Sequence, residues 1–95
     1  MFGLIGKMRA APGKRDQLLA ILLDMKTMPG CLNYIVATDP EDPDAIWITE
    51  VWTDEASHTA SLQLPEVKAA IAKAMPIIAG FDSHTRTVPV GGVGL

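Results

Sequence analysis

Apolar residues follow two different periods along the chain, and these periods divide it into strands and helices. Alternation and β-branched or aromatic side chains predict strands over residues 2–10, 31–38 and 46–53, and a polar alternation predicts a last strand over residues 81–88. Apolar residues at helical spacing predict helices over residues 14–27 and 66–75, joined to the third strand by a shorter helix that Asp54 caps. Counting the last two helical segments as one connection, the order is strand, helix, strand, strand, helix, strand.

The strand over residues 46–53 is apolar on both of its faces. Strand side chains alternate, which places Ile48, Glu50 and Trp52 on one face. The other face carries Trp47 and Val51. A strand of this kind belongs in the middle of a sheet that is covered on both sides. We therefore expect helices on one face and a second layer on the other.

This order of elements is typical of the ferredoxin-like α+β fold, β-α-β-β-α-β, in which one four-stranded antiparallel sheet carries its helices on a single face. We expect a single domain over residues 1–88 and a glycine-rich tail over residues 89–95. The open sheet face is apolar in the central strand, and burying it is worth about 25 cal/mol per Å². We therefore expect a homodimer through the sheet face, as in a dimeric α/β barrel.

Composition narrows the choice of partners. The 95 residues are 48% hydrophobic and carry a net charge of -3 without a basic stripe, so we expect no nucleic-acid partner. The single cysteine excludes an intrachain disulfide and fits a reducing cytoplasm. The start has no signal-peptide layout, and the longest apolar run, residues 18–23, is far shorter than the ~20 residues of a membrane span. We expect a cytoplasmic protein with no membrane contact.

Two short motifs carry a family resemblance. Pro-Gly-Cys-Leu-Asn-Tyr at 29–34, and Ile-Thr-Glu-Val-Trp at 48–52 before a capped helix, resemble the antibiotic biosynthesis monooxygenase family of dimeric α/β-barrel proteins. The likeness covers nearly the whole chain in order. That family includes cofactor-independent oxygenases of hydroquinones and polyketide anthrones, haem-degrading enzymes, and proteins without known activity. The resemblance implies the fold more specifically than the reaction.

Individual residues sharpen the resemblance. Trp52 matches the family's tryptophan at the pocket edge, and Glu50 matches the glutamate before it. Many members have a histidine nine residues after that tryptophan, where this chain has Ser61, with His58 three residues earlier on the same helical face. The haem-degrading branch has its histidine ligand near Ile71, which cannot bind iron. We therefore expect no haem, no metal and no other cofactor.

The implied reaction is the oxidation of a small aromatic hydroquinone or anthrone by O2. Such a substrate supplies its own electrons once deprotonated, so the protein needs a dry pocket, a base and oxyanion donors. His58 is the candidate base, because a place in the first helical turn disfavours imidazolium; the alternative is a surface histidine without a catalytic role. Trp47 is assigned to the dimer face. The substrate-binding candidates are Asn33, Tyr34, Glu50, Trp52 and Ser61.

Other polar residues receive structural interpretations. We expect Arg9 or Arg86 to form an ion pair with Glu50 across the sheet, with substrate orientation as the alternative. His84 is expected to be an exposed strand residue, and Cys31 to pack as a small apolar side chain.

Two other functions compete with the oxygenase. One is a non-catalytic binding or stress-response dimer that holds a small hydrophobic ligand in the same cavity. The other is a dimerisation scaffold, which predicts a cavity filled by methionine side chains. Those methionines are Met8, Met25, Met28 and Met75.

Overall fold

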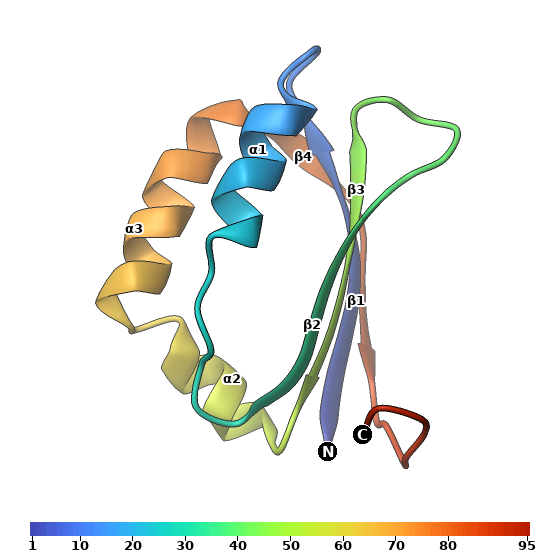
Figure 1. Cartoon of the computed structure of the whole chain (residues 1–95), viewed down its shortest axis with the longest axis vertical. Coiled ribbons are helices and arrows are strands. Elements are labelled where there is room, and N and C mark those ends of the chain that lie inside the picture. The colour runs from blue at the N-terminus through green and yellow to red at the C-terminus, as the bar shows by residue number, and fades with distance from the viewer.

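Four strands form one antiparallel sheet in the computed structural model, which describes residues 1–95. The elements in chain order are β1 (Phe2–Ala10), α1 (Arg15–Leu23), β2 (Cys31–Thr38), β3 (Ala45–Trp52), α2 (Glu55–Ser61), α3 (Pro65–Ala74), the 3-10 helix η1 (Met75–Ile77) and β4 (Ile78–Thr87). The helices lie on one side of the sheet (Figure 1). This is the expected ferredoxin-like α+β fold.

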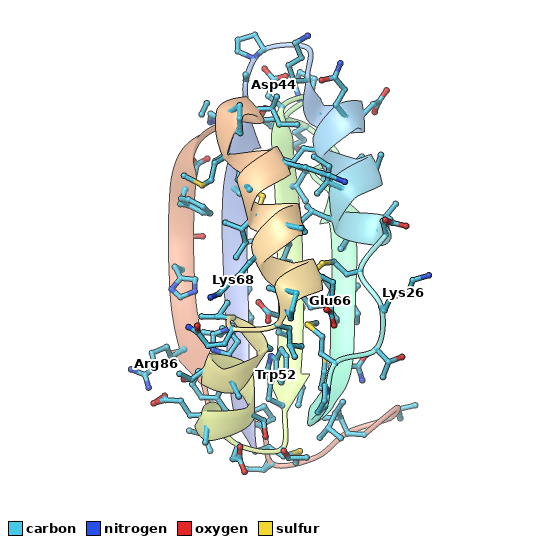
Figure 2. The ribbon with its side chains drawn as sticks, turned by 90° about the vertical axis from the view of Figure 1, so that its left-hand side faces the viewer. Lys26, Asp44, Trp52, Glu66, Lys68 and Arg86 are labelled. Carbon is cyan, nitrogen blue, oxygen red and sulfur yellow. The ribbon has the colours of Figure 1, made fainter.

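The strand order β2-β3-β1-β4 puts the two apolar strands β1 and β3 in the centre. Figure 2 looks onto the helical side and shows α1 and α3 side by side over the sheet, with α2 near one end. The face under the helices is called the inner face below, and the other is called the open face. None of the helices combines the length and apolarity needed to cross a membrane.

Local signals explain most element boundaries. The Asp54 carboxylate accepts a hydrogen bond from the Ser57 backbone N–H at 2.7 Å, so the predicted cap of α2 is confirmed. Pro65 occupies the first turn of α3, where its missing N–H costs nothing. The predicted extension of the first helix to residue 27 is wrong, because α1 ends at Leu23 before the chain turns back at Gly30, whose φ is +81°.

The last strand begins earlier than its sequence pattern predicts. β4 starts at Ile78 rather than at residue 81, because η1 makes the turn that the apolar connection was expected to make. Two register shifts, between Lys7 and Met8 and between Arg9 and Ala10, let β4 follow β1 along nearly its whole length.

The core between sheet and helices consists of two separate clusters. The larger contains Leu18, Ile46 and Ile48 and lies under α1 and the end of α3. The smaller contains Trp52 and Val67 and lies near α2. Residues from both clusters line one cavity, which therefore lies between sheet and helices.

The open face combines exposed apolar residues with a charge network. Ile5 and Ile35 are 39% and 52% exposed there. The network joins two cations to three carboxylates, through Lys7 with Asp39 and Asp82, and Arg9 with Asp42 and Asp82. Trp47 donates its indole N–H to Asp39 at 2.9 Å.

Candidate functional site

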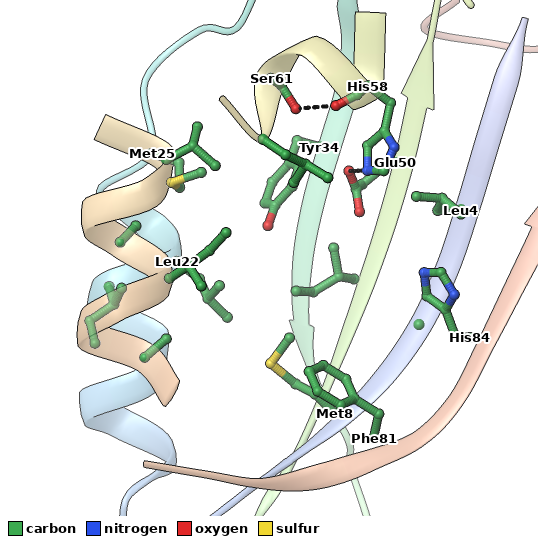
Figure 3. A pocket seen from close by; sticks show the side chains of 18 of the residues that line it. Leu4, Met8, Leu22, Met25, Tyr34, Glu50, His58, Ser61, Phe81 and His84 are labelled. Carbon is green, nitrogen blue, oxygen red and sulfur yellow. Dashed lines mark hydrogen bonds and ion pairs between the residues drawn. The ribbon is translucent and has the colours of Figure 1, made fainter. Parts of the chain in front are cut away.

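A cavity of about 320 Å³ lies between the inner face of the sheet and the helices. Most of its lining side chains are apolar (Figure 3). The four methionines at positions 8, 25, 28 and 75 all line it, and this volume remains open between them. The cavity thus has the dry character that ligand pockets share, with few polar groups to orient a ligand.

Strand register places the polar lining residues in rows. Tyr34 pairs with Glu50, and Glu50 pairs with Leu4, so these three form one row across the inner face. The next row runs from Ile48 on β3 through Gly6 on β1 to His84 on the edge strand β4. Because alternate residues share a face, the row containing Glu50 lies directly beside that row.

Glu50 is the centre of a polar cluster at one end of the cavity. The Trp52 indole N–H donates to Glu50 Oε1 at 3.0 Å. His58 Nε2 lies 4.0 Å from the same oxygen, and the Trp52 and His58 rings meet edge to face with centroids 5.4 Å apart. Trp52 is only 1% exposed, which fixes the donor that orients the carboxylate. His58 is therefore a candidate base, and the Glu50 carboxylate beside it is held in place by Trp52.

His58 lies at the middle of a very short helix. It is the fourth of the seven residues of α2, so it belongs to the last turn as well as to the end of the first. Its ion-pair partner is Glu50. The Ser61 hydroxyl donates to the His58 carbonyl oxygen at 2.6 Å, so Ser61 lines the cavity with its hydroxyl already bonded to the helix.

Tyr34 adds a hydroxyl to the cavity wall. Burial raises the pKa of Tyr34 to about 12, and the neighbouring Glu50 carboxylate adds to the shift. The phenol therefore remains a neutral hydrogen-bond donor throughout the physiological range. Burial, followed by Glu50, also raises the pKa of the Cys31 thiol, which keeps it protonated and less nucleophilic.

Several expected neighbours of the site lie elsewhere. Asn33 is not on the cavity wall, and its side-chain amide donates to the Gly94 carbonyl of the tail at 3.3 Å. The expected arginine pair with Glu50 is wrong, since Arg9 pairs with Asp42 and Asp82 on the open face. Arg86 pairs with Glu55 instead.

Sequence reasoning did not assign His84 to the cavity. It lies on β4 and is exposed, as expected, but it also lines the cavity. The signal that could have revealed it is the pairing of the first and last strands in this fold, which puts His84 opposite Gly6. Ile71 lines the cavity from α3. No group of three His, Cys, Asp or Glu side chains converges to hold a metal.

The protein is of the small ferredoxin-like α+β class, with an apolar cavity and a Trp-Glu-His cluster between its sheet and its helices. The chain belongs to the antibiotic biosynthesis monooxygenase family, whose model matches residues 1–73. A candidate antibiotic biosynthesis monooxygenase from Chloroflexus aurantiacus J-10-fl is 64% identical, with 96% of this chain and 94% of that chain covered and a TM-score of 0.94.

More distant solved structures share the fold. A candidate family member from Deinococcus radiodurans is 23% identical, with 98% and 96% of the chains covered and a TM-score of 0.77. Another from Bacteroides thetaiotaomicron VPI-5482 is 18% identical, with 97% and 91% covered and a TM-score of 0.82. No functionally curated protein matches the chain.

Proposed function

We propose that this protein is a cofactor-independent monooxygenase that oxidises a small aromatic hydroquinone or anthrone with O2. The observation that carries the proposal is the acid–base cluster of Glu50 and His58 at one end of an otherwise apolar cavity. A volume of about 320 Å³ lies at the low end of the ~300–1,000 Å³ typical of ligand pockets, which favours a small planar substrate.

His58 takes the proton that starts the reaction. Its imidazole accepts the proton of a substrate hydroxyl or activated methylene, and Nε2 of the resulting imidazolium lies 4.0 Å from Glu50 Oε1. The carboxylate stabilises that charge, while the Trp52 N–H keeps the carboxylate in place. The Tyr34 hydroxyl, whose raised pKa keeps it protonated, is the donor for a developing oxyanion.

Oxidation then needs only the substrate anion and O2. One electron passes from the anion to O2, the substrate radical and superoxide combine into a peroxide at carbon, and the O–O bond breaks with loss of water. The carbon gains one oxygen atom, the second oxygen atom leaves in water, and the substrate supplies all four electrons. The apolar walls protect the radical pair from water.

Oxygen consumption tests the proposal. Wild type, His58→Ala and the exposed neighbour variant Thr59→Ala are compared with 1,4-dihydroxynaphthalene and with anthrone, after autoxidation is subtracted. Loss of a general base costs about 10²- to 10⁴-fold in rate. We expect saturable uptake that Thr59→Ala retains and His58→Ala loses by at least about 100-fold.

The other outcomes separate the competing functions. Saturable uptake that His58→Ala retains would keep the oxygenase and remove His58 as its base. An absence of uptake above autoxidation, with tight binding of the same aromatics, would identify a binding protein instead.

We also propose that the working form is a homodimer joined through the open face. Ile5 and Ile35 support this, because they expose apolar surface beside the central strands. Sedimentation over a range of protein concentrations should give the mass of two chains. A monomer at all concentrations would reject this arrangement.

A further inference from the structure

The proposed reaction makes no use of His84, which lies on a different wall of the cavity from His58. His84 is on the edge strand β4 and pairs with Gly6 of β1. A Cβ atom at Gly6 would lie 3.7 Å from His84 Cδ2, so the imidazole lies beside the bare backbone of β1. Glycine within a strand lacks a side chain to pack and marks sites where another group approaches closely. Here it leaves the imidazole open to the cavity.

The strand geometry separates His84 from the Glu50 cluster. Glu50 lies on β3, two strands away from β4 and one row along. With strands about 4.8 Å apart and about 6.7 Å between alternate residues, their Cα atoms lie about 12 Å apart. Figure 3 shows His84 apart from Glu50 and His58, with Leu4 between the two groups. The cavity therefore has two separate polar sites, and most of its other lining side chains are apolar.

The two polar sites differ in how their side chains are occupied. Glu50 accepts from Trp52 and lies next to His58, so its site is already organised within the protein. His84 lines the cavity but takes no part in the side-chain hydrogen bonds there. A neutral imidazole offers one donor and one acceptor, which suits a hydroxyl or a carbonyl oxygen.

We infer that His84 binds the oxygen at the far end of the substrate and so sets the specificity of the cavity. The inference rests on the proposed function and names its substrate class: planar aromatics with oxygen functions on opposite sides of the ring system. The proton-donating group of such a molecule lies at Glu50 and His58 while its second oxygen reaches His84. A phenol with a single oxygen loses the second contact.

Binding without oxygen tests this separately from catalysis. The probes are 1,4-dihydroxynaphthalene and 1-naphthol, which lacks the second oxygen, titrated by calorimetry under nitrogen. One net hydrogen bond is worth about tenfold in affinity, so we expect the wild type to prefer the dihydroxy probe by about that factor. In the His84→Ala variant, the affinity for the dihydroxy probe should fall to the affinity for 1-naphthol. The affinity for 1-naphthol should not change. His84→Gln, which keeps a donor and an acceptor, should retain most of the preference.

Each result has a clear meaning. Equal affinity of the wild type for both probes, binding of neither, or a preference that survives in His84→Ala would overturn the role of His84. Thr85→Ala, on the open face of the same strand, serves as the control and should keep the preference. A preference that depends on His84 without any oxygen consumption would support the binding role of His84 while rejecting the monooxygenase.

Discussion

The two faces of the sheet each receive one tryptophan from β3, and each tryptophan binds a carboxylate. On the inner face, Trp52 is 1% exposed and donates to Glu50 at 3.0 Å. On the open face, Trp47 is half-buried and donates to Asp39 at 2.9 Å. The same pair of groups, five residues apart on one strand, thus occurs in two different environments.

The environment decides what each pair does. The Trp47 indole N–H, with backbone N–H groups and Lys7, lowers the pKa of Asp39 to about 2, so that carboxylate is a fixed charge in an ion-pair network. Glu50 instead lies in a mostly apolar cavity, and its charge helps to raise the pKa of the neighbouring Tyr34. A carboxylate next to cations forms ion pairs that stabilise the fold. A carboxylate in an apolar cavity instead shifts the pKa values of the groups around it.

Removal of each tryptophan should show the largest difference between the faces. Trp52→Ala empties a fully buried site in the smaller core cluster and should cost about 3–5 kcal/mol in the free energy of unfolding. Trp47→Ala loses a hydrogen bond and part of a half-buried contact, and should cost about 1–2 kcal/mol. Chemical denaturation at one fixed protein concentration measures both. Equal losses would mean that Trp47 is packed as tightly as a core residue, as burial in the proposed dimer would make it.

Two glycines of β1 sharpen the comparison in packing. A Cβ at Gly3, on the open face, would overlap Thr87 and lie 2.9 Å from Pro89, so Gly3→Ala should cost about 1–3 kcal/mol. A Cβ at Gly6, on the inner face, meets nothing closer than 3.7 Å. Gly6→Ala should therefore leave the free energy of unfolding unchanged or raise it by up to about 1 kcal/mol. A large loss in Gly6→Ala would show that the cavity is closed in solution.

The fold was predictable because its determinants are local or periodic. The two apolar faces of β3 imply a central strand, and Asp54 and Pro65 mark helix starts whatever the tertiary context. The end of α1 was harder to predict, since its apolar pattern continues to Met25 and only the turn at Gly30 shows where the chain must leave the helix.

The site was only partly predictable for the opposite reason. Glu50 and Trp52 share a face by simple alternation, so their neighbourhood follows from sequence. The partners of the arginines depend on which strands pair and on the register shifts in β4, which no local pattern encodes. His84 was assigned only to an exposed strand for the same reason.

The smallest predicted effect concerns the titration of Tyr34, the only tyrosine of the chain. Its absorbance near 295 nm reads this one group, and we expect a midpoint close to pH 12 in the folded protein. The unfolded chain ionises near pH 10. The folded state therefore binds the extra proton between these values, and stability falls as pH rises from about 10 to about 12.

Glu50 and Asp39 variants assign the cause of that shift. Burial is the larger cause and Glu50 the second, so Glu50→Gln should lower the Tyr34 midpoint while leaving it above 10. Asp39→Asn removes a carboxylate from the open face and should leave the midpoint where it is. Equal shifts in the two variants would mean that Tyr34 responds to overall charge. The inner-face carboxylate would then have no special coupling to the cavity, and the contrast between the two tryptophan–carboxylate pairs would reduce to their burial.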